Sequence, residues 1–313
     1  MSKPEQNERT RQLLTEHART YPELTVQDVL KFLHQSVFGC EHLVTSVESA
    51  AVNIEREYAG MSTKPAVGLL TELLAGTLTE PLAGTPAAGL LTEPLAGDYG
   101  RVSLSCLSAG LRADTLARLF VASSKREAEG AKRLRPMLEI AGALAREGAL
   151  PFSHGEFEDS VAQWAAKGYP AVRHSERFRE KYHPAYRVIA KEYILFLPLL
   201  AEIDRRLASG TRAVIAIEGG SASGKTTLSR LLEELYACTV FHMDDFFLQA
   251  WQRTPERYAQ PGGNIDHERF LAEVLQPLQK GEPVRYRKFD CSSLSLGAEE
   301  EVTPGRLVIV EGA

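Results

Sequence analysis

Apolar residues recur at intervals of three and four through most of the first 210 residues, the spacing of helices that bury one face. A mainly α-helical first domain over residues 1–210 is therefore expected, ending near Ser209-Gly210. Its predicted helices are three within the first 60 residues, two between Ala113 and Gly148, one over Glu156–Ala166 and a long one from about Tyr186 to Leu207.

The pattern changes beyond Thr211, where short apolar runs alternate with helical spacing. Ala213–Ile217 is an apolar run followed by an amphipathic stretch, and Arg306–Gly312 contains another apolar run. Buried strands that alternate with helices are typical of a parallel sheet. Residues 211–313 are thus predicted to form an α/β domain.

Residues 63–97 are a low-complexity segment with three copies of a Leu-Thr-Glu-x-Leu-Ala-Gly repeat. The first two copies are rich in Gly, Pro and Thr and show no sustained period, so a duplicated, disordered loop over about residues 63–90 is expected. The third copy leads into Arg101–Leu107, which alternates like a half-buried strand. This copy is expected to belong to the fold.

Glycine spacing after the run Ala213–Ile217 points to a phosphate-binding loop, Gly-Gly-Ser-Ala-Ser-Gly-Lys-Thr-Thr. Such a loop turns its N–H groups toward an anion, and the following helix adds its positive end. Lys225 is expected to contact the outer phosphates of ATP, and the Thr226 hydroxyl is expected to bind Mg²⁺. The predicted nucleotide-binding residues are Gly219, Gly220, Ser221, Ala222, Ser223, Gly224, Lys225, Thr226 and Thr227.

Carboxylates follow two further apolar runs. Asp244 comes after Thr239–Met243, where a parallel sheet would place it beside the loop, and it is a candidate base for a substrate hydroxyl. A solvated acidic turn is the alternative for this position. Glu311, at the end of Arg306–Gly312, is a candidate second group directed at Mg²⁺.

Composition narrows the function classes. The chain has 313 residues, 44% of them hydrophobic, and a net charge of -5, which argues against nonspecific binding to nucleic acid or to acidic membranes. Its four cysteines form no Cys-x-x-Cys pair. The polar N-terminus and the absence of a long apolar stretch predict a cytoplasmic protein with no membrane span.

From about Thr211 onward the sequence resembles the uridine kinase and phosphoribulokinase family of P-loop kinases. The resemblance rests on the glycine-rich loop, Asp244-Asp245-Phe246-Phe247, Asn264–His267, Val284–Tyr286 and Val308–Gly312.

This resemblance implies a P-loop NTPase fold and Mg²⁺-dependent transfer of the γ-phosphate of ATP to a hydroxyl of a small molecule. It implies that Lys225 and Asp244 are catalytic, that Thr226 and Glu311 serve the metal, and that Asp266 and Tyr286 touch the acceptor. Asp266 is equally explained as a helix N-cap.

Two departures qualify the resemblance. The match is loose over residues 287–291, so the acceptor stays open. Members of that family continue past the equivalent of Ala313 through further strands and a lid that carries arginines, so a C-terminally incomplete kinase domain with poor turnover is expected. A nucleotide-dependent switch or ATP-binding protein without a small acceptor is the alternative.

Two segments of the first domain leave alternatives open. Tyr169–Arg187 mixes aromatic and cationic residues, which suits either recognition of a phosphate or a nucleic-acid end, or a connector that packs its rings on the next helix. His34–His42 concentrates His, Cys and Glu, which suits either a metal site or a glycine break between two helices. The domain as a whole is expected to shape the acceptor pocket or the interface of a homo-oligomer.

Overall fold

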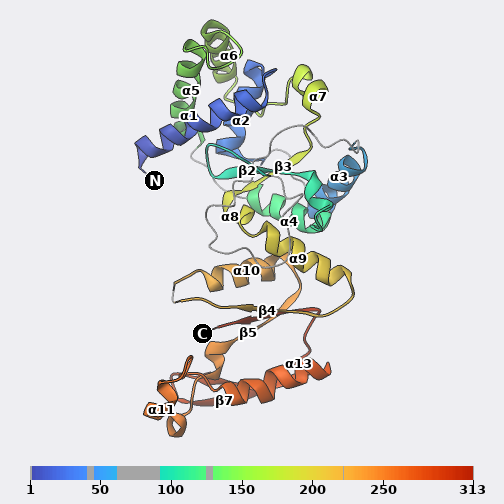
Figure 1. The fold of residues 1–313 in the computed structure, drawn as a ribbon, viewed down its shortest axis with the longest axis vertical. Coiled ribbons are helices and arrows are strands. Elements are labelled where there is room, and N and C mark those ends of the chain that lie inside the picture. Colours follow the sequence, from blue (N-terminus) through green and yellow to red (C-terminus); the bar gives the residue numbers. More distant parts are fainter. Residues whose placement is uncertain (1, 41–45, 62–91, 125–129, 221, 313) are drawn as a thin grey trace. The chain divides into compact units, whose positions relative to one another are not determined.

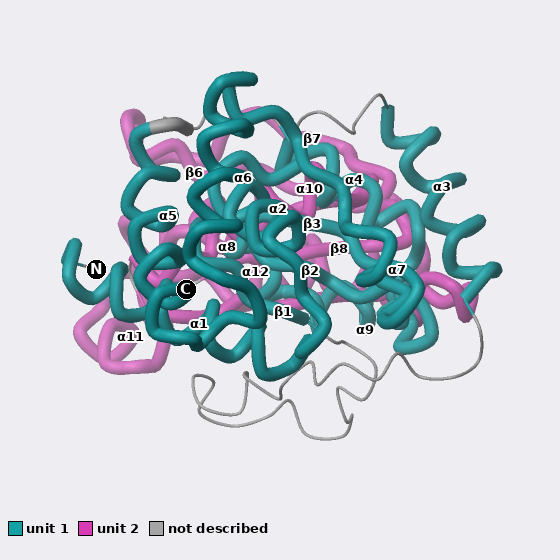
Figure 2. The backbone as a smooth tube through the Cα atoms, turned by 90° about the horizontal axis from the view of Figure 1, so that it is seen from above, with its two compact units in different colours: residues 1–204 teal, residues 205–313 magenta. Residues whose placement is uncertain are grey.

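The computed structural model describes residues 2–40, 46–61, 92–124, 130–220 and 222–312. The chain divides into two compact units, residues 1–204 and 205–313 (Figure 2). The predicted disordered loop, residues 63–90, lies entirely outside the described residues, as do Ser221, Glu41 and His42. Within the described ranges, no helix combines the length and apolar character needed to cross a membrane.

Helices make up most of unit 1, as the apolar spacing predicts (Figure 1). Several begin at Ser or Thr residues whose side chains cap the first turn; Ser46, Ser153 and Ser175 each accept a hydrogen bond from a backbone N–H of the helix they precede. The helices are α1 (Lys3–Thr20), α2 (Val26–Phe38), α3 (Val47–Ala59), α4 (Ala113–Ser124), α5 (Gly130–Arg146), α6 (His154–Ala166), α7 (Glu176–Tyr182), α8 (Lys191–Ile194) and α9 (Leu197–Ala208).

Unit 1 also contains a three-stranded antiparallel sheet in the order β1 (Thr92–Pro94), β2 (Tyr99–Ser103), β3 (Tyr186–Ala190). The prediction of one helix from Tyr186 to Leu207 is wrong over its first part. Val188 and Ile189 are β-branched and buried, and β3 pairs with β2, a partner far away in sequence. Helical structure resumes only at α8 and α9.

The prediction of a half-buried strand over Arg101–Leu107 is also partly wrong. The strand ends at Ser103, whose hydroxyl accepts from the N–H of Ser105 and starts a 3₁₀ turn over Leu104–Leu107. Tyr99–Val102 is buried at every residue instead of alternating. Because both faces of this strand are packed, its residues do not alternate between buried and exposed, which is the pattern that the sequence prediction assumed.

The third repeat copy belongs to the fold, as expected. Thr92–Pro94 forms β1, and Leu95 and Ala96 are buried. Gly97 lies against α2 so closely that a Cβ there would sit 1.8 Å from the carbonyl oxygen of Ser36. Only glycine fits this position.

Unit 2 contains a parallel sheet of three strands in the order β4 (Ala213–Ile217), β8 (Leu307–Glu311), β5 (Cys238–His242). The helix α10 (Lys225–Leu235) connects β4 to β5 and packs against β5 and β8. It buries Ser229, Leu231, Leu232 and Leu235, the stripe expected of an amphipathic helix. Residues 205–312 thus include an α/β arrangement with a parallel sheet.

Residues 243–302 of unit 2 pack on the other side of this sheet from α10 (Figure 1). Their core joins Phe241 and Val308 of the sheet to Phe246, Phe270 and Tyr286. The elements are 3₁₀ turns at Met243–Phe246 (η3) and Ala250–Gln252, α11 (Pro255–Tyr258), α12 (His267–Phe270), a π-helical turn at Leu271–Leu275, α13 (Gln276–Lys280) and the antiparallel pair β6 (Val284–Asp290) and β7 (Ser295–Val302).

Candidate phosphate-binding site

The glycine-rich segment connects the carboxyl end of β4 to the first residue of α10, as the sequence predicts. Gly224 is the N-cap of this helix and has a left-handed backbone with φ of 92°, a conformation that glycine adopts without strain. The first N–H groups of an 11-residue helix therefore face the loop, together with its positive end. This geometry suits an anion.

Lys225 folds back over the loop. Its Nζ donates to the carbonyl oxygens of Gly219 at 2.7 Å and of Gly220 at 3.2 Å. The ammonium group is thus held beside the N-terminus of α10, where a bound phosphate would find both a point charge and backbone donors.

Thr226 and Glu311, predicted to serve the same metal ion, are in direct contact. The Thr226 hydroxyl donates to Oε1 of Glu311 at 3.1 Å. Glu311 ends the central strand β8, and its side chain is 12% exposed. Mg²⁺ in nucleotide sites commonly takes one or two protein oxygens and completes its shell with phosphate and water, so these two groups fit that ion.

His242 completes the contact and was not singled out from the sequence. It ends β5 directly opposite Glu311 in the parallel register, and its Nδ1 donates to Oε2 of Glu311 at 2.6 Å. Both carboxylate oxygens of Glu311 therefore have a partner. Polar residues at the ends of two strands can be found in the sequence. Their contact can be predicted only when the two strands are known to be neighbours in the sheet.

The two aspartates after β5 differ in environment. Both lie in η3; Asp244 is exposed and Asp245 is half-buried. Burial raises the pKa of Asp245, while Lys288 of β6 acts in the opposite direction. Asp244, the predicted base, is exposed to solvent, and its role stays a prediction. Asp245 is the aspartate whose partly buried environment the sequence did not predict.

Asp266 is 4% exposed and caps α12. Its Oδ1 accepts from the N–H of Arg269 at 3.0 Å, and its Oδ2 accepts from Nε2 of Gln252 at 2.8 Å. The N-cap interpretation of this residue is confirmed. Its carboxylate is held by the fold, and contact with an acceptor stays a prediction.

Tyr286 is likewise buried, at 5% exposure. Its ring stacks on Phe246 with 5.6 Å between centroids, and its hydroxyl lies 3.5 Å from Oε2 of Glu300. Burial raises the pKa of this phenol. Tyr286 thus shares the core with the strand that precedes Asp244, and only its polar end faces charged groups.

The structure therefore brings some predicted residues together and leaves others apart. Thr226 and Glu311 touch, and Lys225 is bonded to the loop. Within the described residues, Asp266 bonds to Gln252 and Arg269, and Tyr286 bonds to Glu300, instead of to that group. Nor does the described part of the chain hold three or more His, Cys, Asp or Glu residues placed to bind a metal ion.

A scan against protein-family models finds no match. Among solved structures, the chain is similar to that of a possible uridine kinase from Bacillus stearothermophilus, with 25% identity and a TM-score of 0.29. The match covers 33% of this chain and 61% of that one. The chain thus spans less than two thirds of the length of the structure it matches.

Proposed function

We propose that the domain beginning near Thr211 binds ATP with Mg²⁺ and transfers the γ-phosphate to a hydroxyl of a small molecule. The observation that carries the proposal is the contact between Thr226, next to the loop lysine, and Glu311, at the end of the central strand. It places a hydroxyl and a carboxylate beside the anion-binding end of α10. A loop with a purely structural role has no need of this arrangement.

Each residue then has a defined role. Lys225 and the first N–H groups of α10 hold the outer phosphates, while Thr226 and Glu311 hold the metal and its water shell. Asp244 accepts the proton of the acceptor hydroxyl. The hydroxyl oxygen bonds to the γ-phosphorus as the bond from that phosphorus to the bridging oxygen breaks, and ADP leaves with the bridging oxygen.

The test measures ATP binding by calorimetry and ATP consumption with a panel of nucleosides, sugars and vitamins. Lys225→Ala is expected to weaken MgATP binding at least tenfold, since it removes a charge-assisted contact. Asp244→Asn is expected to leave MgATP binding within twofold and to lower turnover at least a hundredfold. Asp159→Asn, on an exposed face of α6, is the matched control.

Outcomes separate the kinase from the alternative function. MgATP binding that depends on Lys225, with no acceptor consumed by any member of the panel, favours a nucleotide-dependent switch or an ATP-binding protein. MgATP affinity that is unchanged in Lys225→Ala contradicts both. Full turnover in Asp244→Asn removes that residue from the mechanism.

A further inference from the structure

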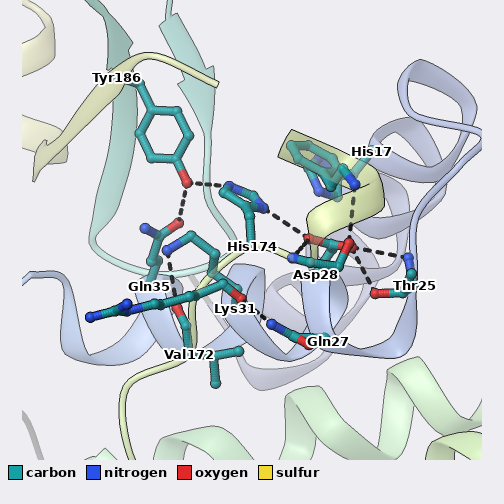
Figure 3. A network of polar contacts seen from close by, with 12 residues as sticks. His17, Thr25, Gln27, Asp28, Lys31, Gln35, Val172, His174 and Tyr186 are labelled. Carbon is teal, nitrogen blue, oxygen red and sulfur yellow. Dashed lines mark hydrogen bonds and ion pairs between the residues drawn. The ribbon is translucent and has the colours of Figure 1, made fainter. Parts of the chain in front are cut away.

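Helix α2 turns a polar face toward the interior of unit 1. Asp28, Lys31 and Gln35 share one side of the helix and point toward His174 and Tyr186 (Figure 3). Asp28 is 0% exposed and Gln35 6%. Buried polar side chains on an amphipathic helix cost free energy unless they are bonded, so each bond has to be traced.

One half of this cluster is fully bonded. The Asp28 carboxylate accepts from Thr25, from both the N–H and the hydroxyl of Ser175, and from Nδ1 of His174 at 2.9 Å. The other imidazole nitrogen of His174 accepts from the Tyr186 hydroxyl at 2.6 Å. These hydrogen bonds hold Asp28, His174 and Tyr186 in fixed positions. Both oxygens of the Asp28 carboxylate are occupied by them.

The other half is centred on Arg101 of β2, whose side chain is 2% exposed. Its Nε donates to Gln35 at 2.9 Å, and its Nη1 donates to Oε2 of Glu93 at 2.9 Å. The remaining oxygen of Glu93 accepts from Nδ1 of His17 at 2.6 Å. Within the described residues, Nη2 of Arg101 and Nε2 of His17 are buried and have no partner.

Aromatic rings hold the guanidinium in place. Its carbon lies 4.7 Å from the centroid of Tyr186 and 5.5 Å from that of Phe32. His17 packs on the same Phe32 ring at 4.7 Å between centroids. The packing of these rings therefore sets the direction of the N–H groups on Nη2 of Arg101.

Lys31 adds a second cation beside Arg101. Its Nζ donates to the carbonyl of Val172 at 3.0 Å. Asp28, the carboxylate that acts electrostatically on Lys31, is already bonded as described above. Burial, followed by the charge of Arg101, lowers the pKa of Lys31 to about 8. Arg101 and Lys31 thus bring two positive charges close together, and Nη2 of Arg101 still has N–H groups to donate. An anion bound there would accept charge-assisted hydrogen bonds in a site that is shielded from water.

We propose that Arg101 and Lys31 form a second binding site, in unit 1, that takes a small molecule through a phosphate or carboxylate group. The segment 169–187, with its mixture of aromatic and cationic residues, contributes Tyr186 and His174 to this site. The site is separate from the glycine-rich loop and does not depend on its function. A buried guanidinium nitrogen without a partner costs free energy, and an anion bound beside Arg101 would satisfy it.

The test measures anion binding by calorimetry on the full chain carrying Lys225→Ala. This substitution is made so that the glycine-rich loop contributes little to the measured binding. Inorganic phosphate and acetate are titrated separately at constant ionic strength. One of them is expected to bind at a single site, and Lys31→Met, which keeps the side-chain length, is expected to weaken that binding at least tenfold. Arg101→Gln is expected to abolish it.

Arg135→Gln is the matched control, since Arg135 is 85% exposed and pairs along its own helix with Glu139. Its affinity for either anion is expected to equal that of the Lys225→Ala parent. Binding of phosphate alone or of acetate alone identifies the recognised group and supports the site. The site is refuted if neither anion binds in the Lys225→Ala chain, or if Lys31→Met, shown to be folded by circular dichroism, binds as tightly as the parent.

Discussion

Oε2 of Glu311 accepts a hydrogen bond from Nδ1 of His242 at 2.6 Å, across the parallel register of β8 and β5. The same carboxylate accepts from Thr226 through its other oxygen. Glu311 thus links the first turn of α10 to the ends of two neighbouring strands. Its orientation is fixed by these two hydrogen bonds.

Replacing Glu311 with Gln keeps a side chain of the same shape and removes its charge. We expect MgATP to bind about tenfold more weakly, while ATP in excess EDTA binds as in the parent, because only the metal-bound form needs the carboxylate. Calorimetry in the two buffers measures both affinities. Glu282→Gln, exposed in the same unit, should change neither; an equal loss in EDTA would show that Glu311 acts without the metal.

Gly97 tests the packing of the third repeat copy. An alanine there would drive its Cβ into the carbonyl of Ser36, and we expect Gly97→Ala to destabilise unit 1 by about 1–3 kcal/mol. Urea unfolding followed by Trp164 fluorescence, in a Trp251→Phe background, reports this loss. Gly155→Ala in α6, where a Cβ meets nothing within 4 Å, should instead stabilise by about 0.5–1 kcal/mol.

His174 is expected to make unit 1 sensitive to acid. Burial lowers the pKa of His174 from 6.5 to about 4, so between these values the unfolded chain binds a proton that the folded chain refuses. Stability is therefore lost as pH falls from about 6.5 to about 4, by on the order of 2 kcal/mol.

The control is His174→Asn, which has no titrating group at this position. It loses the bonds to Asp28 and Tyr186 and should be less stable than the parent at pH 7. The free energies of unfolding of the parent and of His174→Asn, measured by urea unfolding at each pH, are expected to converge as the pH falls toward 4. A difference that stays constant between pH 7 and pH 4 would mean that His174 does not titrate as described.

Asp266 distinguishes a structural from a substrate-binding carboxylate. Asp266→Ala removes the cap of α12 and the partner of Gln252, and should cost about 1–2 kcal/mol, with faster hydrogen exchange over residues 267–280. Asp266→Asn keeps a capping oxygen and should exchange at nearly the parental rate. An acceptor KM that rises in Asp266→Asn without any change in exchange would assign the residue to substrate binding.

Local patterns in the sequence predicted local structure well. The glycine spacing placed a loop between a strand and a helix, and Asp266 was recognisable as an N-cap. The largest failure concerns a contact between distant segments. Tyr186–Ala190 is a strand only because β2 is available to pair with it, and nothing within those five residues indicates that partner.

In the candidate sites, too, local motifs were predictable from the sequence and contacts between distant segments were not. Lys225 and Thr226 follow from a motif, whereas the role of His242 depends on which strand neighbours β8. The unpaired nitrogen of Arg101 depends on four segments meeting in one core, among them α1, α2 and β3. Periodicity identifies buried faces, but it does not show which buried polar atoms remain without a bond.

The position of β8 between β4 and β5 constrains how unit 2 is made. A ribosome releases both outer strands long before the one that separates them, so neither has its parallel neighbour until Leu307–Glu311 emerges. Assembly of this sheet is therefore a late, long-range event in biosynthesis. Until then the edges of β4 and β5 that β8 will cover stay unpaired, and unpaired edges can pair with other chains.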